Sequence, residues 1–284
     1  SLYTSSLYAL FGSGFLIIFI TARFFHFAHA VVFTSGAYFT FYFHKLIGFP
    51  LYISIPIAIA LAALLGCLME SLVYRPLRQR GSSPMVMLLA SLGMYIVLQN
   101  CISMFFGDDT KSIRTGVVKE GLPVFGARIT PIQIIIIAVS IVLVVLVAIW
   151  LKKSRMGKAM RAVASDAELA KISGIDSDRV ILWTFAIGSA LAGVAGILVA
   201  MDVDMTPTMG MNALMMGVVA VIIGGVGSIP GVALGALLLG MAQHLGVWKI
   251  SSQWQDAIAF IILFLFLLIR PRGFMGRKVK KVSV

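Results

Sequence analysis

The stretch PIQIIIIAVSIVLVVLVAIWL, residues 131–151, contains no charged side chain. A helix needs about 20 such residues to cross the roughly 30 Å of hydrocarbon in a bilayer, and further uncharged stretches of similar length recur along the chain. Of the 284 residues, 60% are hydrophobic and 12% are charged, and the mean hydropathy is +1.02. Because a soluble domain carries about 25% charged residues, these values predict an integral membrane protein.

The apolar pattern along the whole chain predicts an all-α, polytopic bundle of about eight or nine transmembrane helices. The expected spans are 7–22, 31–47, 51–73, 84–106, 131–151, 180–201, 213–227, 231–247 and 254–269. No remaining stretch is long and polar enough for a soluble domain, so we expect residues 1–284 to form one transmembrane domain. The chain opens on Ser1, and we expect a short N-terminal piece to be missing. No basic residues precede the first span as they would in a cleavable signal.

Lysine and arginine cluster in three short regions of the chain. Residues 75–80 hold three, 152–179 hold seven and 270–281 hold six of the 23 basic residues. Cytoplasmic loops of membrane proteins are enriched in these residues, so we expect all three regions on the cytoplasmic side. The net charge of +12 is then explained by membrane topology and not by nucleic-acid binding.

This orientation also determines which of the remaining segments cross the membrane and which face the outside. Residues 213–227 and 231–247 must each cross or nearly cross the membrane, and the N-terminus lies outside if the first span crosses fully. Residues 107–130 then face out, and their glycines and proline suggest turns or a small hairpin.

The basic loop 152–179 is expected to fold as a helix and turn on the cytoplasmic side, because apolar residues recur in it at helical spacing. Ser165 followed by Glu168 matches a capping box, and Gly174 is suited to end the short helix. Its small residues, if exposed, would let a partner surface approach the backbone closely. The alternative is an ordinary basic loop that touches anionic lipid headgroups. The candidate docking residues are Ser165, Asp166, Ala167, Glu168, Ala170 and Gly174.

A glycine-rich run interrupts the apolar sequence at 224–231. No lysine follows it, so it is not a phosphate-binding P-loop, and no such motif occurs elsewhere in the sequence. We expect this chain to bind no cofactor, and any ATP and Mg to be used on another polypeptide. The run is better interpreted as a tight turn between two packed helices, formed by Gly224, Gly225, Gly227, Pro230 and Gly231.

Polar side chains inside apolar segments mark either a solute pathway or structural contacts. His26 and His29 are three residues apart and would share one helix face, but no further ligand completes a metal site. We expect them to line or brace a pathway, with a purely structural role equally open. Ser91, Gln99 and Asn100 make the fourth span partly polar, and they could contact solute or bond between helices.

Other residues favour structural roles and argue against further functions. Glu70 lies near the end of its span and is expected to pair with Arg75, while Cys67 and Cys101 are expected to pack as small apolar residues. A channel or secondary transporter would show more intramembrane carboxylates than Glu70. No nucleophile and base, and no carboxylate pair, forms a plausible catalytic set, so we expect no enzyme activity.

Four stretches carry a resemblance to a known family. They are Phe27-Ala28-His29 with Ser35-Gly36-Ala37-Tyr38; Glu70 through Tyr74-Arg75-Pro76-Leu77-Arg78; Arg155 through Ala170 to Gly174-Ile175; and 224–231 with Arg270-Pro271-Arg272-Gly273-Phe274. From about residue 5 to 277, in this order, the chain resembles the inner-membrane permease subunits of high-affinity branched-chain amino acid ABC importers. His26 stands where the family usually has Asn, and Ala30 where it usually has Gly. The family resemblance therefore leaves urea, short-chain amides and other amino acids as alternative solutes.

The resemblance implies a complex in the inner (cytoplasmic) membrane of a bacterium or archaeon. Its other members would be a second permease subunit, identical or paralogous, two ATP-binding-cassette ATPases and a periplasmic or extracellular solute-binding protein. The segment Ser165–Gly174 would dock into an ATPase and pass its closure to the spans. Such a bundle must have two states that bind the nucleotide-loaded ATPase differently.

Overall fold

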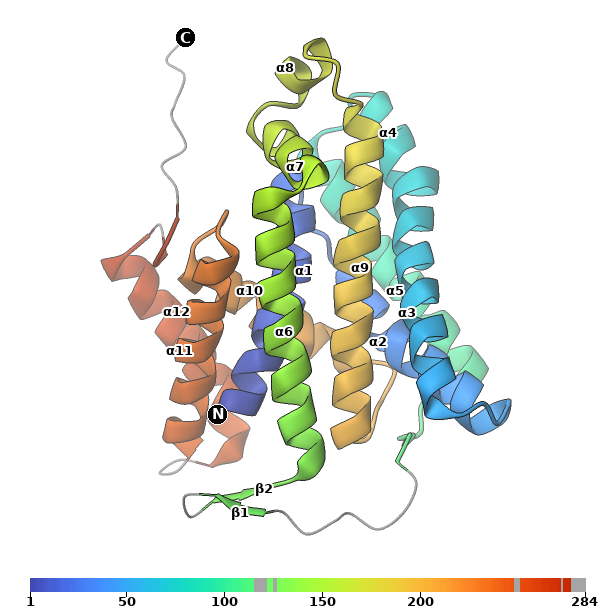
Figure 1. Ribbon diagram of the computed structural model, residues 1–284, viewed down its shortest axis with the longest axis vertical. Coiled ribbons are helices and arrows are strands. Elements are labelled where there is room, and N and C mark those ends of the chain that lie inside the picture. The colour runs from blue at the N-terminus through green and yellow to red at the C-terminus, as the bar shows by residue number, and fades with distance from the viewer. Residues whose placement is uncertain (115–121, 125–126, 248–250, 272, 277–284) are drawn as a thin grey trace.

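The computed structural model describes residues 1–114, 122–124, 127–247, 251–271 and 273–276 as a bundle of helices (Figure 1). In this part of the chain, seven helical segments are long and apolar enough to cross a membrane. They are α1 (Leu2–Ala22), the run Leu51–Gln79, α5 (Pro84–Phe106), α6 (Pro131–Lys153), α9 (Ser177–Asp202), α11 (Ile229–Val247) and the run Ser252–Ile269, which contains η3 (Ser252–Trp254) and α12 (Gln255–Ile269). Two shorter helices, α2 (His29–Phe41) and α10 (Met209–Gly224), have 13 and 16 residues and are too short to count as spans, so the expected eight or nine spans fit the structure only roughly.

Several helices differ from the predicted spans at their ends. The second span is divided into α2 and a wider π-helical turn, η1 (Tyr42–Leu46). The third is one continuous run of α3 (Leu51–Met69), a second π-helical turn η2 (Glu70–Tyr74) and α4 (Arg75–Gln79). A π turn changes the backbone hydrogen-bond spacing without changing hydropathy, so the apolar pattern could not reveal either one.

The loops contain the expected small elements. In 107–130, β1 (Leu122–Val124) pairs antiparallel with β2 (Ala127–Ile129), which confirms the hairpin and is a small exception to the all-α prediction. Gly116, Gly121 and Gly126 lie outside the described residues. The basic loop holds two helices, α7 (Arg155–Ser165) and α8 (Ala167–Ile172).

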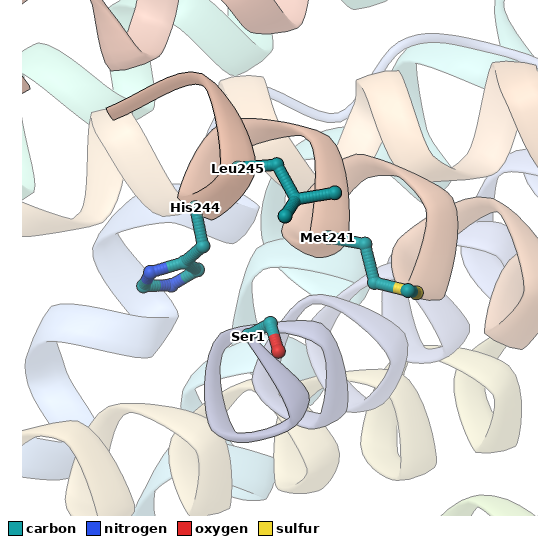
Figure 2. A pocket seen from close by; sticks show the side chains of 4 residues that line it. All are labelled: Ser1, Met241, His244 and Leu245. Atoms are coloured by element: carbon teal, nitrogen blue, oxygen red, sulfur yellow. The ribbon is translucent and has the colours of Figure 1, made fainter. Parts of the chain in front are cut away.

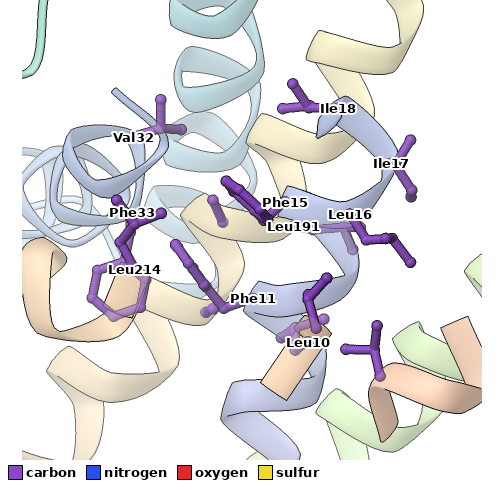
Figure 3. Close-up of a cluster of buried hydrophobic side chains, with 14 of the residues drawn as sticks. Leu10, Phe11, Phe15, Leu16, Ile17, Ile18, Val32, Phe33, Leu191 and Leu214 are labelled. Carbon is purple, nitrogen blue, oxygen red and sulfur yellow. The ribbon is translucent and has the colours of Figure 1, made fainter. Parts of the chain in front are cut away.

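Helix α1 runs through the middle of the bundle (Figure 1) and is buried along most of its length. A helix that is apolar on all sides can be covered by lipid or by other helices, and α1 is covered by α6, α9, α10 and α11. The buried cluster in Figure 3 includes Leu10, Phe11, Phe15, Leu16, Ile17, Ile18, Val32, Phe33, Leu191 and Leu214. By contrast, little of α5, α6 and α12 is buried, and many of their large apolar side chains are exposed, as on lipid-facing helices.

Glycine permits the closest helix crossing. A Cβ atom added to Gly36 of α2 would lie 2.6 Å from the Cα of Gly193 in α9, so a larger residue has no room there. Close backbone approach at small residues is how helices gain packing contacts in lipid.

The two ends of the bundle have different character. Helices α4, α7 and α8 lie at one end, and the β hairpin lies at the other (Figure 1). The basic regions 75–80 and 152–179 therefore share one end, as the charge pattern predicts. Of the basic tail, Arg270 follows the last turn of α12, whereas Arg272, Arg277, Lys278, Lys280 and Lys281 lie outside the described residues.

Candidate functional site

The joint between α7 and α8 is formed by Asp166. Its backbone is extended, with φ −155° and ψ 112°, and its carboxylate accepts hydrogen bonds from the N–H groups of Glu168 and Leu169 at 3.0 Å. Asp166 is therefore the N-cap of α8, and the predicted capping box from Ser165 to Glu168 is wrong. The reason is that Ser165 is still part of α7, and an N-cap residue needs a non-helical backbone.

Gly174 ends α8, as predicted. Its φ is +82°, and its N–H donates to the carbonyl of Lys171 at 3.0 Å while the N–H of Ile175 donates to that of Ala170 at 3.0 Å. This is the Schellman pattern, which requires a left-handed residue such as glycine after the helix.

The surface of α8 differs from the predicted one. Ala167 and Glu168 are exposed, but Ala170 is only 4% exposed and belongs to the buried core. The expectation that the small residues as a group face a partner is therefore wrong at Ala170, which holds α8 against the bundle. The large apolar residues are exposed instead, Leu169 at 61% and Ile172 at 83%. Sequence reasoning missed this pair, although their spacing of three residues puts both on one helix face.

An ion-pair cluster joins the start of α9 to the run Leu51–Gln79. Asp178, in the first turn of α9, bonds to Arg75 at 3.2 Å and to Arg78 at 3.0 Å. Arg78 also bonds to the buried carboxylate of Glu70 at 2.6 Å. The predicted pair of Glu70 with Arg75 is therefore wrong. Glu70 and Arg78 are eight residues apart, about two helical turns, so they lie on the same side of the helix. Arg75 pairs with Asp178 instead.

Between α1 and α2 the chain passes through the core. His26 is fully buried, with its Nδ1 atom 3.2 Å from the hydroxyl of Tyr74 and 3.3 Å from the hydroxyl of Ser91. The Ser91 hydroxyl accepts the backbone N–H of Ala28 at 3.0 Å. The centres of the His26 and His29 rings are 5.7 Å apart. The structure therefore brings together three of the five polar residues that the sequence singled out.

His29 is enclosed by aromatic rings. Its ring centre lies 4.8 Å from that of Phe11 and 6.0 Å from that of Phe15. Neither of its ring nitrogens has a hydrogen-bond partner among the described residues. Both histidines are fully buried in the core. Among the described residues no three His, Cys, Asp or Glu side chains lie close enough to hold a metal ion.

The two remaining polar candidates on α5 are arranged differently. Ser91, Tyr95 and Gln99 follow one another every four residues and so share a face, and Gln99 is half-buried. Asn100 is exposed and donates to the carbonyl of Ile96 in its own helix at 2.7 Å. The structure does not bring Asn100 to the histidines.

The glycine-rich run forms the predicted tight turn between two packed helices. Gly225 and Gly227 have φ of +97° and +106°, and Pro230 lies in the first turn of α11. A side chain on Gly224 would overlap the backbone of Gly231. The last sequence motif packs here too. The N–H groups of Phe274 and Met275 donate to the carbonyls of Ile223 at 2.9 Å and Gly224 at 3.0 Å, at the end of α10.

A small open pocket lies where the start of α1 meets the end of α11 (Figure 2). It is lined by Ser1, Met241, His244 and Leu245. Thr4 bonds to Nε2 of His244 at 2.8 Å beside it. This contact fastens the two helix ends together, well away from α8.

Comparison with known proteins gives one family. Residues 1–267 match the family described as branched-chain amino acid transport system / permease component. The chain is 34% identical to the high-affinity branched-chain amino acid transport system permease protein BraD of Pseudomonas aeruginosa, over 98% of this chain and 94% of that protein. It is equally similar to LivH of Escherichia coli K12, a protein of the same description. A probable branched-chain amino acid permease LivH of Methanocaldococcus jannaschii is 27% identical over 98% of this chain and 91% of that protein.

A solved structure has the same overall fold. PsaBC from Streptococcus pneumoniae in complex with Fab aligns over 99% of this chain and 92% of that chain, with a TM-score of 0.53 and 12% identity. At this identity the likeness concerns the fold alone. With a match over nearly its whole length and relatives at 34% identity, the chain belongs to the family of branched-chain amino acid transport system permease components.

Proposed function

We propose that this chain is the membrane-spanning subunit of an ABC importer that carries branched-chain amino acids across the inner membrane of a bacterium or archaeon. The observation that carries the proposal is the family match over residues 1–267. Within the complex, ATP and Mg are used by two partner ATPases, a second permease subunit completes the pathway, and a solute-binding protein delivers the solute.

In this proposal an ATPase docks on the surface that α8 presents at the end of the α7–α8 element. Leu169 and Ile172 present two large apolar side chains at the end of the bundle, flanked by exposed Glu168 and Lys171. Exposed apolar residues with a polar rim are typical of protein interaction sites. Asp166, Ala167 and Gly174 hold or border this surface.

Motion of α8 would reach the core through α9. The hydroxyl of Ser177 donates to the carbonyl of Ala167 at 3.2 Å, and Asp178 follows with its arginine partners. Because α9 packs along α1, α2 and α3, a push on its first turn tilts the centre of the bundle. Such packed elements switch between discrete arrangements instead of deforming continuously.

The solute itself follows from the relatives. The proteins that match at 34% identity are named for branched-chain amino acids, whereas a fructose import permease of Bifidobacterium longum is 28% identical over 69% of this chain. A second candidate is another small polar solute such as urea, a short-chain amide or a different amino acid. It is favoured by His26 and Ala30, which replace the usual Asn and Gly beside the core segment. We assign His26, His29 and Ser91 a bracing role next to the pathway.

Docking is tested by co-purification of the ATPase with the tagged permease. Ala167→Trp adds bulk on the exposed face of α8, and Leu169→Asp with Ile172→Asp removes its apolar side chains. Both changes should abolish ATPase co-purification while leaving the permease inserted. Lys158→Gln is the matched control, because Lys158 is exposed on α7 outside the proposed surface. If the element touches lipid headgroups instead, Lys158→Gln weakens its membrane contact and Ala167→Trp has no effect.

Orientation is tested with single cysteines in a variant that lacks Cys67 and Cys101. Asp109→Cys lies at the hairpin end and should react with a membrane-impermeant thiol reagent in intact cells. Ser173→Cys lies at the α8 end and should react only after the cells are opened. Both residues are exposed, so the reverse pattern would overturn the orientation.

A further inference from the structure

Arg23 has an unusual backbone. It follows the last residue of α1 with φ 58° and ψ 29°, and it is the one non-glycine residue with positive φ in the described part of the chain. The left-handed region is costly for a residue with a Cβ atom. Such strain persists where surrounding contacts hold it in place, and it is often found at functional sites.

Hydrogen bonds from the Arg23 side chain to α7 hold this residue in its left-handed conformation. Its Nη2 atom donates to the carbonyl oxygens of Ala164 at 2.8 Å and Ser165 at 2.6 Å. These are the last two residues of α7, whose terminal carbonyls have no partner within the helix. A cation is also favoured at a helix C-terminus by the helix dipole. Arg23 thus caps α7 from a different helix, directly beside Asp166.

The residues after Arg23 lead into the core. Phe24 is buried, with its ring centre 4.8 Å from that of Tyr74. Two residues later His26 contacts Tyr74 and Ser91, and α2 begins at His29. Arg23 therefore stands between the α7–α8 joint and the segment 24–28 that positions α2.

This contact gives the α7–α8 element a third connection. Along the chain the element is joined to α6 on one side and to α9 on the other. Neither connection joins the residue that precedes the buried segment 24–28, although Phe185 of α9 packs against His26 with ring centres 5.1 Å apart. The Arg23 hydrogen bonds do, so a displacement of the Ser165 and Ala164 carbonyls pulls on this residue.

We propose that Arg23 is a positioning residue that transmits displacement of the α7–α8 joint to the segment 24–28 and to α2. The inference rests on the proposed function, because it supplies the ATPase that moves the joint. Charge-assisted hydrogen bonds are directional, and these two tie the Arg23 side chain to the last two carbonyls of α7. The alternative is that Arg23 does no more than stabilise the end of α7.

The test compares variants in the reconstituted complex of permease, ATPase and binding protein. Arg23→Asn removes the guanidinium while keeping a residue type that tolerates the left-handed region. Arg80→Asn is the matched control, since Arg80 is an exposed arginine at the same end that makes no side-chain hydrogen bond among the described residues. The readouts are ATPase co-purification, basal ATP hydrolysis, and solute moved per ATP hydrolysed.

If Arg23 transmits the displacement, its loss should lower the solute moved per ATP without lowering ATPase binding. Arg23→Asn should keep ATPase co-purification and basal hydrolysis near wild type, while solute moved per ATP falls about tenfold, the scale expected from losing charge-assisted hydrogen bonds. Arg80→Asn should leave the ratio unchanged. A structural cap alone would instead lower co-purification and uptake together and leave the ratio as in wild type, which overturns the inference.

If Arg23→Asn does not insert into the membrane, a second variant, Arg23→Lys, still tests the inference. Arg23→Lys keeps a cation on a shorter side chain, which weakens the two hydrogen bonds that Nη2 of Arg23 makes, so the ratio should fall to an intermediate value. An unchanged ratio in Arg23→Lys would also overturn the inference. Failure of the proposed function is seen separately, because the wild-type complex would then move no solute with ATP.

Discussion

The carboxylate of Glu70 lies 2.6 Å from the guanidinium of Arg78, two turns further along one continuous helix. The Glu70 side chain is 1% exposed and that of Arg78 is 26% exposed. Arg78 also bonds to Asp178, at the start of the helix that follows α8. Glu70, which could have indicated proton coupling, is thus paired in a charge cluster that fastens α4 to α9.

The two halves of this pair should respond unequally to mutation. Arg78→Met leaves a buried carboxylate without its partner, and breaking a buried pair in this way costs about 3–5 kcal/mol. Glu70→Gln should cost less, because Arg78 keeps Asp178 as a partner. The double variant should recover much of the loss. Thermal unfolding of the purified protein measures all three, and equal losses from the two single variants would contradict this account of the cluster.

Ser91 should matter for stability through its contacts with the backbone N–H of Ala28 and with Nδ1 of His26. Ser91→Ala leaves the buried N–H of Ala28 unpaired, which costs about 1–3 kcal/mol. Ser140 is the matched control, because it is equally buried and its hydroxyl has no partner among the described residues. Ser140→Ala removes a hydroxyl that has no hydrogen bond to lose, so the unfolding free energy should stay the same or rise. A loss in Ser140→Ala as large as in Ser91→Ala would contradict the bracing role.

Alanine substitutions at Gly36 and Gly93 should have different effects on stability, because Gly36 lies in a close helix crossing and Gly93 does not. Gly36→Ala places a methyl group against the backbone of Gly193 and should destabilise the protein by about 1–3 kcal/mol or more. Gly93, on α5, has no atom within 4 Å of the added Cβ. Gly93→Ala should therefore be neutral or stabilise by up to about 1 kcal/mol. Thermal unfolding distinguishes them, and the crossing of α2 with α9 would be mistaken if Gly36→Ala were as stable as wild type.

Gly174 and Gly81 lie at the same end of the bundle and have a similar positive φ, so alanine should strain the backbone about equally at both. Gly174 has φ +82° and Gly81 has φ +70°, and neither has a neighbour within 4 Å of an added Cβ. Alanine at either position should cost about 1–2 kcal/mol through the backbone alone. Only Gly174→Ala should weaken ATPase co-purification, because Gly174 ends α8. Similar ATPase association in both variants would argue against docking at this element.

The sequence could predict the architecture because hydrophobic length decides it. Span 84–106 coincides with α5, and the start of span 131–151 coincides with the start of α6, since a proline follows a capping residue at both places. The Gly174 helix end and the turn at 224–231 were also predictable, because glycine is favoured wherever φ is positive.

Several features depend on tertiary contacts that no local pattern encodes. Asp166 and Ser165 are both good caps, and which of them caps α8 depends on where α7 ends. Ala170 is buried because α8 folds back on the bundle. Asn100 and Gln99 are adjacent in sequence, but on a helix adjacent residues are turned about 100° apart. The partners of Arg23 are 141 and 142 residues away in the chain, so composition and spacing cannot indicate them.

The central claim is that ATP hydrolysed by a partner docked on α7–α8 drives branched-chain amino acid import through this chain. Uptake of radiolabelled leucine into proteoliposomes that hold the complete complex tests it most directly. We expect uptake that requires ATP and Mg, is suppressed by excess valine or isoleucine, and is lost in Ala167→Trp but kept in Lys158→Gln. Leucine uptake that proceeds without ATP, or at the wild-type rate in Ala167→Trp, would contradict the claim.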